Sequence, residues 1–135
     1  MSDFGDVTKI AKKAMEIRKR YYELMDNVET RPIVAQLYAD GVSRLMEWNG
    51  HLLDTQEDVV RYLSSLPKTK HTIDSLDAQP LPGNNDADLF LMTVSGKVTY
   101  DEEHSRTFFQ RMIVREVNGK HYIINDYLRW TSETT

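Results

Sequence analysis

The sequence of 135 residues contains no cysteine, which excludes disulfide bonds and cysteine-ligated metal sites and leaves the redox compartment open. No apolar run approaches membrane-spanning length. The amino terminus lacks a basic segment followed by an apolar one, so no secretory signal is expected. Positive charge is not in excess, because 17 Lys and Arg stand against 21 Asp and Glu and give a net charge of −4. A duplex-binding module usually has a basic face and a basic total charge. These absences indicate a cytosolic or nuclear protein that contacts neither membrane nor nucleic acid directly.

Motifs of catalysis and cofactor binding are equally scarce. None of the four histidines stands at metal-ligand spacing with another histidine or with a carboxylate on a helix. A nucleophile elbow, a phosphate-binding loop and a Rossmann glycine pattern are all missing from the sequence. We therefore expect no metal and no cofactor, and the sequence favours a protein that is not an enzyme.

The most informative segment is a predicted pair of strands over residues 107–130. Asn118 and Gly119 are typical of a two-residue type I′ turn, which needs positive φ at both positions. If Val117 pairs with Lys120 beside this turn, the pairing of all residues farther from the turn is fixed. One face then carries Phe109, Arg111, Ile113, Arg115, Val117, Tyr122, Ile124, Asp126, Leu128 and Trp130. The other carries Phe108, Gln110, Met112, Val114, Glu116, His121, Ile123, Asn125, Tyr127 and Arg129. A sheet with one solvated side should be polar on that side. Both faces here hold large apolar groups, so we expect a partner subunit to cover one of them.

Helices are predicted before this run of strands. Apolar residues recur every three or four positions from Val7 to Val28, which predicts an amphipathic helix. Pro32 suits the first turn of a second helix. A hairpin is predicted over 43–53, and a third helix begins at Thr55 with a capping box closed by Asp58. Further strands are predicted over 71–79 and 88–100. We expect one α+β domain over residues 1–135, with a curved antiparallel sheet and three helices packed in its concave side.

Two constellations allow more than one interpretation. Arg111 and Asp126 fall opposite each other in the predicted register, which favours a cross-strand pair. Alternatively, Asp126 points into an internal cavity as a general base, although a facing arginine would lower its pKa and spoil that role. The acidic run from Asp101 to Glu103 is either a solvated loop at the edge of the sheet or an acidic patch for a basic partner.

Several short stretches, in their order and spacing over nearly the whole chain, resemble the nuclear transport factor 2 family. They are residues 21–26, 48–50, 66–67, 76–81, 96–98, 108–112 and 125–129. The resemblance implies the cone of this family, a curved sheet against three helices, which agrees with the pattern above. The turn of Trp48, Asn49 and Gly50 and the stretch from Asp77 to Pro80 favour its mRNA-export branch.

The export branch implies a non-enzymatic small subunit that works by pairing. Its partner would be the related domain of the large subunit of the nuclear mRNA export receptor, and the heterodimer would meet FG-nucleoporins while shuttling between nucleus, nuclear pore and cytoplasm. By the resemblance, Tyr127 and Arg129 lie at the interface, with Arg129 paired to an aspartate. The predicted register adds same-face neighbours, namely Phe108, Gln110, Met112, Val114 and Ile123.

Two alternatives remain within this fold. A homodimeric importer of GDP-bound Ran has an acid after the hairpin tryptophan and two more after a later strand. Asp101 and Glu103 match the latter pair, but Asn49 replaces the former. A cavity enzyme of the dehydratase or isomerase type is the other alternative, since a fold does not fix a function.

Overall fold

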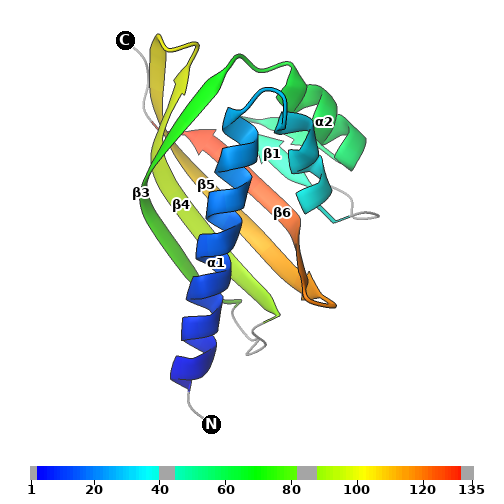
Figure 1. Cartoon of the computed structure of the whole chain (residues 1–135), viewed down its shortest axis with the longest axis vertical. Helices are drawn as coiled ribbons and strands as arrows, with labels where there is room; N and C mark the ends of the chain where they lie inside the picture. Colours follow the sequence, from blue (N-terminus) through cyan, green and yellow to red (C-terminus); the bar gives the residue numbers. More distant parts are fainter. Residues whose placement is uncertain (1–2, 40–44, 82–87, 132–135) are drawn as a thin grey trace.

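The computed structural model describes residues 3–39, 45–81 and 88–131, with side chains from residue 8 onward. Six strands form one sheet in the order β2-β1-β6-β5-β4-β3, which curves around helix α1 (Figure 1). The predicted α+β cone is confirmed. One junction differs from the expected antiparallel sheet, because β1 pairs with β6 in parallel. No helix in these ranges is long and apolar enough to cross a membrane.

The three predicted helices are present. Helix α1, Asp3–Asp26, buries one stripe that includes Ile10, Ala14, Tyr21 and Met25. The second is a 3₁₀ helix, η1, Arg31–Leu37, with Pro32 in its first turn. Helix α2, Gln56–Ser64, begins with the predicted capping box between Thr55 and Asp58. Val28, placed on the helical stripe by its spacing, lies beyond the end of α1 and is exposed.

The strands follow the predicted order. They are β1, Met46–Trp48; β2, His51–Leu53; β3, Thr69–Pro80; β4, Leu89–Tyr100; β5, His104–Val117; and β6, Lys120–Trp130. Both predicted two-residue turns are confirmed by positive φ at their central positions, 47° and 89° at Asn49 and Gly50 and 51° and 81° at Asn118 and Gly119. The first residues of the predicted hairpin over 43–53, positions 43 and 44, lie outside the described ranges.

A bulge in β6 changes the predicted register. Pairing of β5 with β6 follows the prediction from Val117 opposite Lys120 to Val114 opposite Ile123, but Ile113 then pairs with Asn125. Ile124 is therefore the extra residue of a β-bulge. Because side chains alternate between faces, one extra residue turns every later side chain of β6 to the opposite face. The predicted faces are wrong from Asn125 onward.

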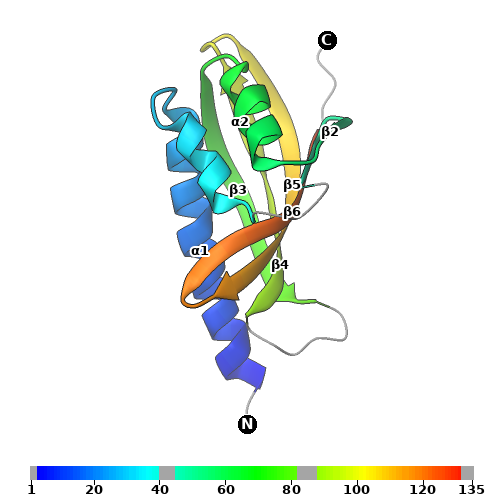
Figure 2. The ribbon, with the colours of Figure 1, turned by 90° about the vertical axis from the view of Figure 1, so that its right-hand side faces the viewer.

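The helices occupy one side of the sheet, as Figure 2 shows for α1 and α2. We call this side the inner face and the opposite side the outer face. Inner-face residues of β4 to β6 form the core with α1 and η1; they include Phe90, Met92, Phe108, Met112, Val114, Ile123 and Leu128. In the part of the chain that the structure describes, no helix packs on the outer face.

Candidate partner interface on the outer face of the sheet

The outer face is continuous across all six strands. One row of directly paired residues runs from Leu52 through Glu47, Tyr127, Arg111 and Thr93 to Asp77. Arg111 is thus paired with Tyr127, and its guanidinium carbon lies 5.1 Å from the centre of that ring. The predicted pairing of Arg111 with Asp126 is wrong, because the bulge turns Asp126 to the inner face.

This face is rich in aromatic, aliphatic and arginine side chains. Its partly exposed apolar members include Leu89, Leu91, Phe109, Ile113, Tyr122 and Tyr127. Leu52 and Val117 are more exposed still, at 62% and 46% of their surface. Three exposed arginines lie among them, Arg111, Arg115 and Arg129. Aromatic residues and arginine are the types enriched in protein–protein interfaces and their hot spots. The composition therefore suits a surface that a second protein covers.

The residues predicted for the interface fall into two groups. Tyr127 and Arg129 lie on the outer face, where Tyr127 is partly exposed and Arg129 exposed. Their predicted same-face neighbours do not: Phe108, Gln110, Met112, Val114 and Ile123 lie on the inner face and are at most 1% exposed. The prediction that these five share a face with Tyr127 and Arg129 is wrong. The outer-face neighbours on β5 are instead Phe109, paired with Arg129, and Arg111, paired with Tyr127.

Asp126 is the centre of a buried polar cluster on the inner face. Its carboxylate accepts hydrogen bonds from the hydroxyl of Tyr38 at 2.5 Å, the amide nitrogen of Gln110 at 2.9 Å and the hydroxyl of Tyr21 at 3.4 Å. The Gln110 amide is oriented in turn, because its Oε1 accepts from Tyr22 at 2.6 Å. Burial raises the pKa of Asp126 to about 6, although the hydrogen bonds from Tyr38, Gln110 and Tyr21 oppose the shift.

This environment changes the interpretation of Asp126 as a base. The expectation of an arginine-depressed pKa is wrong, since burial raises it. The carboxylate is nevertheless enclosed by donors, and the residue is only 1% exposed. A general base must reach the proton that it removes. The geometry is that of a structural carboxylate, which joins α1, η1 and the sheet.

Arg31 is a buried charge that the sequence did not reveal. It is 1% exposed, and its guanidinium donates to backbone oxygens at the ends of both α-helices. The acceptors are the carbonyls of Met25 at 3.0 Å, Leu63 at 3.2 Å, Leu66 at 2.8 Å and Pro67 at 3.0 Å. Burial lowers the pKa of Arg31, and the nearby Asp26 carboxylate offsets this shift only in part. Carbonyls at a helix end have no partner within the helix, and a cation there also complements the helix dipole. Arg31 therefore fastens α1, α2 and the start of β3 together.

Asp26, the last residue of α1, also binds the start of β3. Its carboxylate accepts from the backbone nitrogen of His71 at 2.8 Å, from His71 Nδ1 at 2.5 Å and from the hydroxyl of Thr69 at 2.9 Å. Burial alone would raise the pKa of Asp26, but these hydrogen bonds hold it below its ordinary value. Within the described ranges, no group of three or more His, Asp or Glu side chains could hold a metal ion.

The acidic turn and Asn49 have different environments. Asp101 and Glu102 adopt positive φ, 50° and 63°, in the exposed turn between β4 and β5. Asn49 is structurally engaged: its side-chain oxygen accepts from the backbone nitrogen of Trp130 at 2.7 Å. The backbone nitrogen of Asn49 donates to the carbonyl of Leu128 at 2.8 Å. Asn49 thus anchors the end of β6, and the acidic turn is solvent-exposed.

Two curated relatives cover most of the chain. An NTF2-related export protein from Caenorhabditis elegans is 33% identical over 123 residues, which are 89% of this chain and 85% of the relative. Nuclear transport factor 2 from Candida albicans is 32% identical over 119 residues, covering 86% of this chain and 90% of the relative. The named relatives are thus transport factors from both branches that the resemblance suggested.

Solved structures share the fold. Nuclear transport factor 2 from Cryptosporidium parvum superposes with a TM-score of 0.78 at 23% identity, over 91% of this chain and 95% of that one. A chain of the Candida albicans complex of Mtr2 with the Mex67 M domain gives 0.72 at 15% identity, over 93% and 98%. In sequence, the model of the nuclear transport factor 2 (NTF2) domain matches residues 14–130. With that match over most of its length, and with the sheet and helices in the family's arrangement, the chain belongs to the NTF2 family.

Proposed function

We propose that this chain is the non-enzymatic small subunit of a heterodimeric nuclear mRNA export receptor. Its outer sheet face binds the NTF2-like domain of the large subunit. The observation that carries the proposal is a pair of neighbouring cross-strand contacts that are exposed or partly exposed among the described residues of that face: Arg111 stacks on Tyr127, and Phe109 pairs with Arg129 beside them. The 33% identity to an export protein and the likeness to a chain of the Mtr2–Mex67 complex support the same assignment.

Arg129 and Tyr127 are the central contacts in this proposal. Arg129 is exposed in the isolated chain, and covering an arginine without a counter-charge is costly. The partner therefore presents a carboxylate to Arg129. Arg111 on the neighbouring strand holds the Tyr127 ring in place before binding. The ring therefore loses less conformational entropy when the partner binds. The heterodimer, rather than this subunit alone, meets FG-nucleoporins and shuttles through the nuclear pore.

The Ran importer is the second candidate, and Asp101 and Glu103 in the exposed turn are the observation that favours it. Against it stands Asn49, which carries no charge and whose side chain is engaged by the backbone of Trp130. A binding site that lacks one of its charges loses roughly 2–5 kcal/mol when the opposing charge stays buried. The export assignment therefore fits these residues better.

Co-purification with the NTF2-like domain of a large export receptor tests the proposal. We expect a stable one-to-one complex with the wild-type chain and none with Arg129→Glu, because two acids would then face each other. Tyr127→Glu should also abolish the complex by burying a charge. Lys12→Glu makes the same charge change on the exposed side of α1 and is the matched control.

Circular dichroism and size-exclusion chromatography of each isolated variant separate assembly from folding. Folded variants that still co-purify at equal stoichiometry would remove the outer face from the interface. A folded wild-type chain that captures Ran but no large receptor domain would favour the importer instead.

A further inference from the structure

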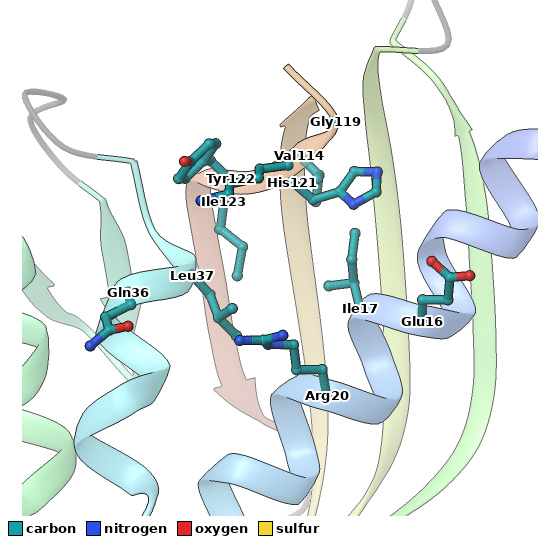
Figure 3. A pocket seen from close by; sticks show the side chains of 11 residues that line it. Glu16, Ile17, Arg20, Gln36, Leu37, Val114, Gly119, His121, Tyr122 and Ile123 are labelled. Atoms are coloured by element: carbon teal, nitrogen blue, oxygen red, sulfur yellow. The ribbon is translucent and has the colours of Figure 1, made fainter. Parts of the chain in front are cut away.

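A pocket of about 460 Å³ opens on the inner side of the molecule, away from the outer face. It lies between the middle of α1, the end of η1 and the β5–β6 hairpin (Figure 3). Its volume falls within the range of roughly 300–1,000 Å³ usual for ligand pockets. None of the functional contacts proposed above uses it.

The pocket combines an apolar floor with a polar rim. Ile17, Leu37, Val114 and Ile123 form the apolar part, and Val114 and Ile123 belong to the buried core. The rim is made by Glu16, Arg20, Gln36, Lys120, His121 and Tyr122, with the backbone of Gly119 beside them. An added Cβ at Gly119 would meet no atom within 4 Å, so the hairpin turn leaves open space there. The floor suits one apolar side chain of a bound peptide. The rim suits the backbone of that peptide and charged side chains next to the apolar one.

The charges at the rim favour an acidic occupant. Arg20 and Lys120 stand on different walls, one on α1 and one on the hairpin. In Figure 3 the Arg20 side chain reaches toward Leu37, whereas the Glu16 carboxylate lies on the other side of Ile17. The nearby acid of the hairpin, Glu116, is already paired with Lys13 at 3.2 Å. Two cations thus flank the pocket in a chain whose net charge is −4.

We propose that this pocket binds a short acidic segment of a partner protein, which inserts one apolar side chain between Ile17, Leu37 and Val114. Carboxylates beside that side chain meet Arg20 and Lys120. An apolar anchor gives most of the affinity in such contacts, and complementary charge gives register and association rate. The pocket and the outer face lie on opposite sides of the sheet, so the chain can hold this segment and a subunit partner at once.

A direct binding measurement tests the proposal with the full chain. The probe is a fluorescein-labelled peptide of six residues, Asp-Glu-Asp-Phe-Asp-Glu, followed by fluorescence anisotropy. One comparison peptide has Ser for Phe, and a second has Lys at each acidic position. We expect binding of the first peptide alone, with shifts of the Gly119 and Leu37 amide signals in ¹⁵N spectra.

Variants of the chain locate the site. The double change Arg20→Glu with Lys120→Glu should weaken binding by about tenfold or more, and Ile17→Asp should abolish it. Lys12→Glu, exposed on the same helix but outside the pocket, should bind as the wild type does. Assembly with the large receptor domain should be unchanged in all three, so failure here is distinguishable from failure of the proposed function.

Three outcomes would overturn the inference. They are the absence of saturable binding by the Phe peptide, equal binding by the Ser or Lys peptide, and equal weakening by Lys12→Glu. The last would indicate general attraction to the basic side of α1 rather than a pocket.

Discussion

The hydroxyl of Tyr38, just after η1, donates a 2.5 Å hydrogen bond to the carboxylate of Asp126 in β6. Tyr21 of α1 donates to the same carboxylate, and its hydroxyl lies 3.0 Å from that of Tyr38. Two helical elements and two strands therefore converge on one buried charge. Such a network stabilises a unique packing only when all of its members are satisfied, so each member should be sensitive to substitution.

Asp126 should make stability fall as pH rises. Its pKa is about 6 in the folded chain and 3.8 in an ordinary environment. The folded chain therefore binds the proton more tightly than the unfolded chain, and the free energy of unfolding decreases between about pH 4 and pH 6, by an amount on the order of 3 kcal/mol. Urea unfolding of wild type and Asp126→Asn across this range measures the difference.

The stability of the Asn variant should stay constant across this window, so its difference from wild type should shrink as pH rises. Asp26, whose pKa is lowered, acts in the opposite direction and only as pH falls below its ordinary pKa, so it leaves the window between pH 4 and pH 6 unaffected. Parallel pH profiles for the two proteins would show that Asp126 does not titrate in this window.

Tyr38→Phe should destabilise the chain by about 1.5–3 kcal/mol at pH 7, because a hydrogen bond to a charged group is lost. The same hydrogen bond lowers the pKa of Asp126, so its removal should move the midpoint of the pH effect upward. Unfolding at pH 7 and pH 4 measures both effects. Tyr127→Phe, on the outer face, is the control and should change neither.

Arg31→Lys should cost roughly 3 kcal/mol, although it keeps the charge. A single ammonium group cannot reach the carbonyls of Met25, Leu63 and Pro67 together, and the orphaned buried carbonyls are costly. Thermal and urea unfolding give the loss directly. Arg61→Lys, at an exposed position of α2, should leave the free energy of unfolding within about 0.5 kcal/mol of wild type. An equal effect of both changes would mean that the guanidinium geometry at Arg31 is unimportant.

Gly96→Ala should disrupt the pairing of β3 with β4. A Cβ at this position would lie 2.1 Å from the carbonyl oxygen of Thr72, a contact that only a backbone shift can relieve. We expect a loss of stability above about 1 kcal/mol, of the size seen for overpacking. Hydrogen exchange should show faster opening of β3. Thr93→Ala, on the outer face of the same strand, provides the comparison.

Calorimetry with GDP-bound Ran should show weak or absent binding, because Asn49 carries no charge and its side chain is engaged by Trp130. Micromolar binding that weakens when Asp101 and Glu103 are changed to Ala would make the import assignment the better one.

Local signals in the sequence predicted the elements well. The capping box at Thr55 and the turns at Asn49 and Asn118 each depend on residues at most three positions apart in the chain, and all three are present in the structure. The type of η1 was not predictable, since proline at the first turn suits α and 3₁₀ helices alike.

The site was harder to predict, for two physical reasons. The turn at Asn118 sets the register only up to the first irregularity, and no glycine marks the bulge at Ile124. Arg31 looks like any surface cation in sequence, because its acceptors are backbone carbonyls that no residue type reveals. Tyr127 and Arg129, which the resemblance assigns to an interface, do lie on the outer face, and their role at an interface stays a prediction.

The extra residue in β6 also sets what a single deletion would do to this protein. Removing Ile124 would restore strict alternation along the strand and exchange its two sides beyond that point. Asp126 and Leu128 would then turn toward solvent, while Tyr127 and Arg129 would turn toward the helices. One residue without a partner in the ladder thus decides which side chains of β6 lie on the outer face and which lie in the core.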